Sequence, residues 1–154
     1  RPLDELVDEL NQMRPVRPLK WSFSLHMVAD DQAQHLGTNG IASHCGPENA
    51  KLPDRVARYA IVSGRINEVI ELGSFSSWDI LTDLLIDDGL ITRKRRKALL
   101  DPTYQYVGIG WSMHKTYGFC TVIVLAENVT ELSNVRLIQY NPTILYSNST
   151  KPKH

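Results

Sequence analysis

The segment "ASHCG" places three side chains that could do chemistry next to one another: Ser43, His44 and Cys45. A serine or cysteine nucleophile needs a base within hydrogen-bonding reach. Neighbouring residues of an extended chain point their side chains apart, and a Cys–His enzyme takes its histidine from a distant part of the sequence. The triplet therefore does not predict a catalytic pair, and we expect no catalytic residues and a protein that is not an enzyme.

A second group of charged residues lies between positions 87 and 97. Asp87, Asp88 and Gly89 follow an apolar stretch, and five consecutive basic residues occupy 93–97. A basic run is typical of a nucleic-acid patch or of a solvated face. The chain has 17 basic and 17 acidic side chains, whereas a nucleic-acid-binding protein usually carries a basic excess. Acids at the end of a helix lie against its dipole, so a nearby cation is expected. We therefore expect the run to serve the structure and not nucleic acid.

Length and composition leave the cellular compartment open. A chain of 154 residues is long enough for one domain with its own core, and its longest apolar stretch, 117–126, is too short to be transmembrane. Cys45 and Cys120 could form one disulfide or remain two buried thiols. The sequons at Asn128 and Asn148 would accept glycan only in a secreted chain.

The hydrophobic pattern predicts helices first and a hairpin last. Apolar residues recur at helical spacing over 3–10, 23–36 and 78–86, and Gly37 and Gly40 are expected to end the second of these helices. Residues 55–62 fit a short helix or an irregular turn, and residues 65–72 alternate like a half-buried strand. Two further segments, 104–115 and 117–127, predict a β-hairpin.

This order of elements favours an α+β domain with helices packed on a small antiparallel sheet. We expect the domain to occupy residues 1–127 and a polar C-terminal extension to occupy 128–154. Three tryptophans, Trp21, Trp78 and Trp111, are expected in the core or at its rim.

From residue 6 to residue 127 the chain resembles the CAP superfamily, also called SCP-like, which includes cysteine-rich secretory proteins, wasp-venom antigens and plant pathogenesis-related proteins. "RPLKWSFSL", "VADDQAQHL", "ASHCG" and "GRINEVIELG" match family segments in the family's order. "LLIDDGLITRKRRKALLDPTYQYVGIGW" resembles the family motif W-I-I-D-D-G-V-x-x-R-G-H-R-x-N-L-L-x-P-x-Y-x-x-V-G-I-G. The residues in register with this last motif include Asp87, Asp88, Gly89, Arg93, Arg96, Tyr104, Gly108 and Gly110. The resemblance implies a three-layer α-β-α sandwich.

The resemblance also implies a central cavity, which in many members holds a divalent ion between two histidines and two acids. The matching positions are His44, Glu68, Asp87 and Arg95, with arginine in place of the second histidine. Arginine has donors only and cannot ligate a metal. We therefore expect Arg95 to pair with Glu68 or Asp87, and prefer Glu68. No cofactor or metal is expected, although weak zinc binding by His44, Glu68 and Asp87 stays open.

The leading hypothesis is a non-enzymatic CAP domain that acts as a protein-interaction or structural module with a pseudo-metal site, for instance as a subunit of a larger assembly. One alternative is a secreted protein that binds lipid or sterol in an apolar groove. A third is a divalent-ion-dependent hydrolase. The expected partners are proteins, with lipid or sterol as the alternative and no nucleic acid. Family members are mostly secreted, which implies an extracellular location; an intracellular assembly subunit is the alternative.

Overall fold

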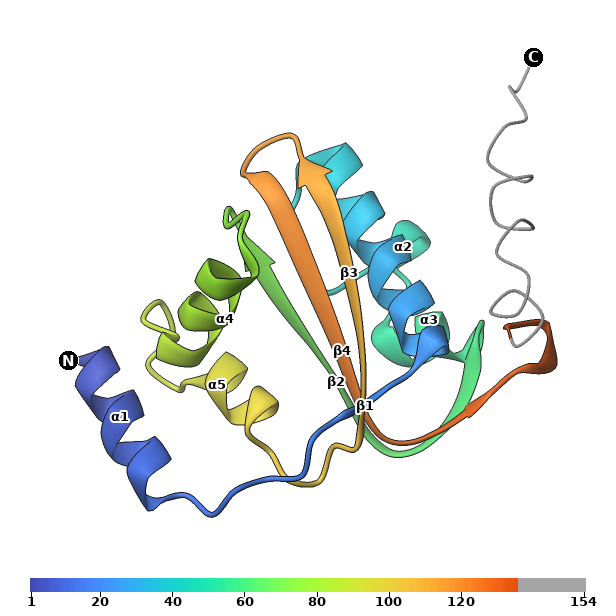
Figure 1. Ribbon diagram of the computed structural model, residues 1–154. Coiled ribbons are helices and arrows are strands. Elements are labelled where there is room, and N and C mark those ends of the chain that lie inside the picture. Colours follow the sequence, from blue (N-terminus) through green and yellow to red (C-terminus); the bar gives the residue numbers. More distant parts are fainter. Residues whose placement is uncertain (136–154) are drawn as a thin grey trace.

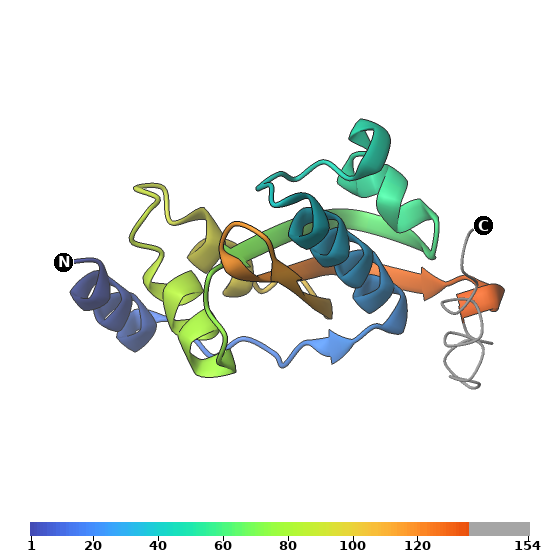
Figure 2. The same ribbon diagram turned by 90° about the horizontal axis from the view of Figure 1, so that it is seen from above.

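In the computed structural model, which describes residues 1–135, a four-stranded sheet lies between two layers of helices (Figures 1 and 2). The strands are arranged in the order β1 (Lys20–Trp21), β3 (Tyr106–His114), β4 (Gly118–Glu131) and β2 (Ala60–Leu72). Helices α1 (Pro2–Gln12), α4 (Ser77–Ile86) and α5 (Lys94–Leu99) lie on one side, and α2 (Phe23–Asn39) and α3 (Leu52–Ala57) on the other. The three-layer α-β-α sandwich is therefore confirmed. The sheet is mixed, because β1 pairs with β3 in parallel.

Helix α2 lies directly on β3 because glycines remove the side chains that would separate them. A Cβ atom added at Gly108 would lie 2.1 Å from the backbone nitrogen of His26, and one at Gly110 would lie 2.3 Å from that of Asp30. Gly37 of α2 makes a similar approach, since its Cβ would lie 2.0 Å from a β3 carbonyl oxygen. The glycines of the "VGIG" segment thus set how closely the helix packs on the sheet.

Helix α2 continues three residues beyond the predicted end at residue 36. Gly37 does not end the helix, which continues to Asn39. Gly40 ends it, with a positive φ of 66° that suits glycine. The close packing on β3 explains why a glycine stands inside the helix.

The segment 55–62, predicted as a helix or a turn, divides between two elements. Helix α3 ends at Ala57 and strand β2 begins at Ala60, five residues before the predicted start at Arg65. The pairing register of β2 with β4 shifts between Ser63 and Ile66. Gly64, which has a φ of 80°, lies in this irregularity, so the alternating pattern is broken there. A short 3-10 turn, η1 (Pro47–Asn49), lies in the loop before α3.

The basic run forms a helix that the sequence pattern did not predict. Lys94 to Leu99 make α5, and Arg93 precedes it with a φ of 52°. Helix α4 agrees with the prediction and begins after Ser76, whose side chain accepts the Asp79 backbone N–H.

Strand β4 runs past the predicted domain boundary at residue 127. It continues to Glu131, which pairs with Ala60 at the start of β2, so the structured domain includes the first residues of the predicted extension. Asn128 lies in this part of β4 and is exposed. Asn148 and the rest of the extension from residue 136 lie outside the described residues.

The two cysteines are not joined. Cys45 and Cys120 are both free thiols, which is one of the two alternatives that the sequence left open, although only Cys120 is buried. Cys120 is buried in β4 within the core cluster under α2, while Cys45 lies in the loop after α2. Burial raises the pKa of the Cys120 thiol to about 11.

Candidate functional site

A cavity of about 910 Å³ lies between the loop after α2, strand β2 and helix α5. His44, Glu68 and Arg95, three of the four positions implied by the family resemblance, line it together with Gly89. The fourth, Asp87, is fully buried and does not line the cavity. The structure therefore brings three of the predicted site residues to one cavity and places the fourth behind them.

Glu68 is held by two partners at one end of this cavity. Its side chain is 2% exposed, and its Oε2 accepts from Nη1 of Arg55 at 2.8 Å. Its Oε1 lies 2.9 Å from Nδ1 of His44. Arg55 also donates to the His44 carbonyl oxygen at 3.0 Å. The buried carboxylate is thus neutralised by a buried guanidinium, and it orients a histidine ring whose side chain is 69% exposed.

The preferred pairing of Arg95 with Glu68 is wrong. Arg95 donates from Nε to Asp87 at 2.6 Å and from Nη1 to Asp83 at 3.0 Å, so the other predicted partner, Asp87, is the one it meets. Arg95 lies in the first turn of α5, close to the end of α4, where both aspartates lie. Glu68 lies on β2, against which α3 packs and brings Arg55 within reach.

Asp87 ends α4 in a left-handed conformation and binds the start of α5. Its Oδ2 accepts the backbone N–H groups of Arg95 at 2.8 Å and Arg96 at 3.4 Å. The expectation that a cation lies near this acid is confirmed. Asp88 and Gly89 form the exposed turn that follows, and Tyr104 is buried in the second core cluster.

The residues present do not fit a metal ion at this cavity. Both Glu68 oxygens are used by His44 and Arg55, and Asp87 is bound by Arg95 and by backbone N–H groups. Within residues 1–135, no three His, Cys, Asp or Glu side chains are close enough together to hold a metal ion. A zinc site needs about four such ligands near 2 Å.

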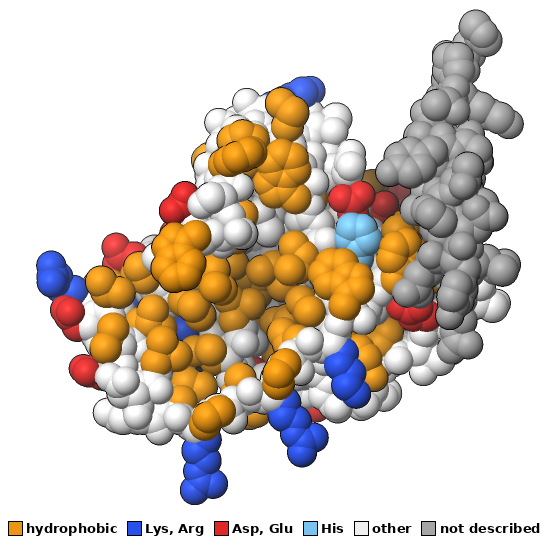
Figure 3. Space-filling model, in the orientation of Figure 1, with side chains coloured by type: hydrophobic (Ala, Val, Ile, Leu, Met, Phe, Trp, Pro, Cys, Tyr) orange, Lys and Arg blue, Asp and Glu red, His pale blue; other side chains and the backbone are white. Residues whose placement is uncertain are grey.

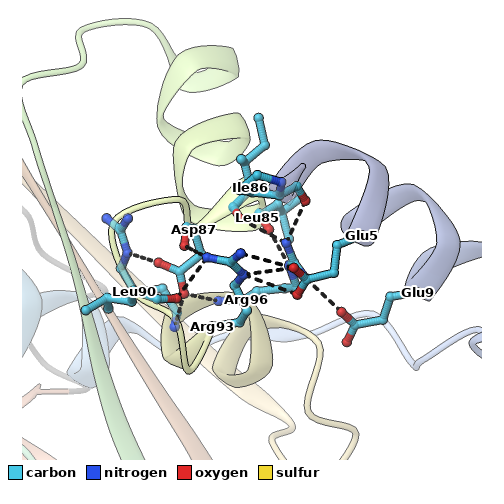
Figure 4. A network of polar contacts seen from close by, with 10 residues as sticks. Glu5, Glu9, Leu85, Ile86, Asp87, Leu90, Arg93 and Arg96 are labelled. Atoms are coloured by element: carbon cyan, nitrogen blue, oxygen red, sulfur yellow. Dashed lines mark hydrogen bonds and ion pairs between the residues drawn. The ribbon is translucent and has the colours of Figure 1, made fainter.

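Arg96 is the centre of a second polar network, which joins α1 to α4 and α5 (Figure 4). Its side chain is completely buried and forms ion pairs of 2.9 Å with both Glu5 and Glu9 of α1. It also donates to the carbonyl oxygens of Leu85 and Ile86 at the end of α4, and to that of Pro2. The carbonyls at the end of α4 are groups that a helix terminus leaves without intrahelical partners.

Arg93 reinforces this network from the other side of Glu5. It donates to both Glu5 carboxylate oxygens and to the carbonyl oxygens of Asp87 and Leu90. Its hydrogen bond lowers the pKa of Glu5, with Arg96 contributing. The two arginines of the family motif therefore have a structural role, as expected from the sequence.

A lysine lies beside the one cysteine of the loop after α2. Nζ of Lys51 is 3.0 Å from Sγ of Cys45. This hydrogen bond lowers the pKa of the Cys45 thiol. Ser43 uses its hydroxyl to accept the Cys45 backbone N–H at 3.0 Å. The three adjacent residues of "ASHCG" therefore point to different partners, and they do not form a catalytic pair.

One end of the sheet is not covered by α4 or α5, and the side chains there form an exposed apolar surface. Figure 3 shows hydrophobic side chains around a hollow on this face. We call it the β3-edge surface. Phe75 lies 6.3 Å from Trp111 and 5.0 Å from Phe119 between ring centroids, and Trp111 stacks on Phe119 at 5.4 Å. The surface consists of Trp21, Phe75, Ile109, Trp111, Met113 and Phe119.

The three tryptophans are more exposed than predicted. Trp21 is 55%, Trp78 74% and Trp111 41% exposed. On β3, Gly108 and Gly110 face α2, so Trp111 lies on the opposite face of the sheet. Alternation along the strand predicts the shared face, but it does not predict that no helix of residues 1–135 covers it.

Beyond Val107, β3 has a strand neighbour only on its β4 side within residues 1–135, because β1 pairs with Tyr106 and Val107 alone. The segment around β1 hydrogen-bonds to odd-numbered residues at the start of β3. The Lys20 N–H donates to the Gln105 carbonyl oxygen, and the Ser22 N–H donates to that of Val107. By alternation, the backbone groups of the later odd-numbered residues point to the same edge.

Part of this edge is already used by α2. The Ile109 carbonyl oxygen lies 2.6 Å from Nδ1 of His26, and the Met113 carbonyl oxygen lies against Gly37. Further along, the Lys115 N–H donates to the Gly37 carbonyl oxygen at 3.1 Å. By alternation, the N–H and C=O groups of Trp111 and the N–H of Met113 point to the short stretch of the edge between these α2 contacts, next to the exposed side chains of the β3-edge surface.

Known proteins resemble this chain in sequence pattern and in fold. The family described as "CAP: Cysteine-rich secretory protein family" matches residues 5–126. An extracellular protein containing an SCP domain from Bacillus anthracis has 20% sequence identity and a TM-score of 0.59 over 79% of this chain and 36% of its own. The chain thus spans about a third of that protein. An outer surface protein from Borrelia burgdorferi has 18% identity and a TM-score of 0.61, over 80% of this chain and 85% of its own. No curated protein matches the chain.

Within residues 1–135, none of the helices has the length and apolar character needed to cross a membrane.

Proposed function

Because the chain belongs to the CAP superfamily of cysteine-rich secretory proteins, we propose that it uses this fold as a non-enzymatic protein-interaction module. The observation that carries the proposal is the stretch of the β3 edge around Trp111, which has no neighbouring strand within residues 1–135, together with its exposed aromatic side chains. The partner is an extended, apolar segment of another protein that adds to β3 as a further strand. The cavity at His44 and Glu68 is, in this proposal, a degenerate metal site in which Arg95 replaces a ligand.

The backbone of β3 favours a protein partner over a lipid. The outward N–H and C=O groups of Trp111 and the N–H of Met113 need hydrogen-bonding partners when they are buried. An added strand supplies them and places its own side chains against the exposed face. Hydrocarbon supplies none, so a lipid covering this edge would leave polar groups unsatisfied.

The extent of the β3-edge surface is also adequate for a specific contact. An aromatic side chain has about 150–250 Å² to bury, so these partly exposed residues offer on the order of 600 Å². Each partner in a standard interface buries about 800 Å². Aromatic residues and methionine are enriched at the centres of such interfaces and often dominate their energy.

Selection of peptides from a random library displayed on phage tests the proposal. We expect peptides with alternating apolar residues to bind the protein. The double variant Trp111→Ser, Met113→Ser should bind the selected peptides at least about tenfold more weakly, since hot-spot side chains each contribute about 1–2 kcal/mol or more. The matched control is Ile61→Ser, Ile91→Ser, which alters two side chains that are 66% and 97% exposed elsewhere on the surface; it should bind as the wild type does.

The apolar hollow also favours a second candidate, a protein that binds lipid or sterol. Vesicles of phosphatidylcholine with and without cholesterol separate the two. If the vesicles bind through Trp111 and Met113 while no peptide is selected, the lipid function replaces the protein-interaction function.

A further inference from the structure

We infer that the cavity at His44 binds a phosphate group carried by an organic molecule, so that a position associated with cations in the family has become an anion site. Four cationic side chains line this cavity, namely Arg65, Lys94, Arg95 and Lys97, against two carboxylates. This leaves an excess of two positive charges before His44 is counted. The inference is independent of the proposed protein interaction, which uses β3.

The carboxylates of the cavity are already neutralised. Glu68 is bound by Arg55 and His44, and Asp101 lies 3.1 Å from Nη1 of Arg65. Arg95 in turn is balanced by two aspartates at the end of α4. The unbalanced charge of the cavity is therefore carried by the two lysines of α5.

Lys94 and Lys97 stand three residues apart on α5, so they share one face of the helix. Both line the cavity. Neither has an ion-pair partner among the described residues. Like charges at this spacing repel each other, and an oxyanion between them would replace repulsion by two attractive contacts.

The rest of the cavity wall is apolar, with contributions from Ile66, Val69, Ile70, Leu72 and Leu90. A volume of about 910 Å³ is in the range of sites for small organic molecules. The combination of an apolar wall and an unbalanced pair of lysines suits a phosphate attached to an apolar body better than a free metal ion. A phosphorylated metabolite and a phospholipid headgroup share this chemistry.

Two probes test the inference on the full chain at low ionic strength: inorganic pyrophosphate by calorimetry, and sedimentation with vesicles containing phosphatidic acid or phosphatidylcholine alone. We expect pyrophosphate to bind, and Lys94→Ala, Lys97→Ala to weaken binding about tenfold, as loss of two charge contacts predicts. Neither lysine is buried, so the variant should keep the wild-type melting temperature. The control Lys20→Ala, Lys115→Ala removes the same charge away from the cavity and should bind as the wild type does.

The pattern across the probes identifies the source of the phosphate. Binding of pyrophosphate without binding of phosphatidic acid vesicles indicates a soluble ligand, and binding of both indicates that headgroups can also enter. If neither probe binds, or if the control variant loses as much affinity as the α5 variant, the inference is wrong.

Discussion

Removal of the Arg96 side chain should be among the most damaging single substitutions in this protein. The guanidinium is completely buried and donates five hydrogen bonds to α1 and to the end of α4. Arg96→Ala leaves the carbonyl oxygens of Leu85 and Ile86 without these partners, at about 1–3 kcal/mol for each that stays buried. Glu5 and Glu9 are 49% and 38% exposed, so water compensates them in part. The expected loss is about 3–5 kcal/mol, as for other broken buried ion pairs.

Thermal unfolding and urea titration measure this loss. For a domain of this size, about 4 kcal/mol corresponds to a melting temperature lower by about 8–16 °C. Arg96→Lys keeps the charge but not the planar fork, and should recover only part of the stability. Lys97→Ala, at the next and exposed position of α5, is the matched control and should change the melting temperature by no more than about 2 °C.

Hydrogen exchange shows whether the damage follows the network. α1 contacts the rest of the domain mainly through α4 and these arginines, so its amides should exchange faster in Arg96→Ala than those of β4. A melting temperature within about 2 °C of the wild type, or acceleration that spares α1, would refute the role assigned to Arg96.

Three further predictions follow from single sites. Cys45 should be alkylated by iodoacetamide at pH 7 at least about tenfold faster than Cys120, because only thiolates react and the pKa values of the two thiols shift in opposite directions. Lys51→Met should slow the alkylation of Cys45, and equal alkylation rates for the two thiols would contradict this prediction. The pKa of Glu5 lies below its ordinary value of 4.5. The stability that the ionised carboxylate contributes is therefore complete above pH 4.5 and is lost as the pH falls below it. In Glu5→Gln, acid denaturation monitored by circular dichroism should depend less steeply on pH in this range. Arg95→His replaces a guanidinium of the cavity with an imidazole, so zinc affinity measured by calorimetry should rise about tenfold or more, and an unchanged affinity would count against the pseudo-metal proposal.

The intact mass of the protein from its native source would test its location. Asn128 is exposed on β4, so a secreted chain is expected to carry glycan there, and treatment with a glycosidase should lower the mass. An unmodified chain would favour the intracellular assembly subunit.

Local sequence patterns were sufficient for the elements with a strong period. The hairpin of β3 and β4 and the helices α1, α2 and α4 agree with the prediction. Each of these depends on alternation or helical spacing, both of which act over a few residues. The glycines of "VGIG" were recognised as motif positions, but their reason, contact with α2, came from the structure.

The tertiary structure decided which charges meet and which apolar residues stay exposed. Arg55 and Arg95 both have long side chains, and only the placement of α3 on β2 and of α5 beside α4 assigns Arg55 to Glu68 and Arg95 to Asp87. In the same way, Trp111 has a large hydrophobic side chain of the kind that usually lies in a core. Its exposure follows from the absence of a covering helix in the described structure. Sequence periodicity fixes which face a side chain shares with its neighbours, whereas partners and covering depend on elements that are distant in the chain and adjacent only after folding.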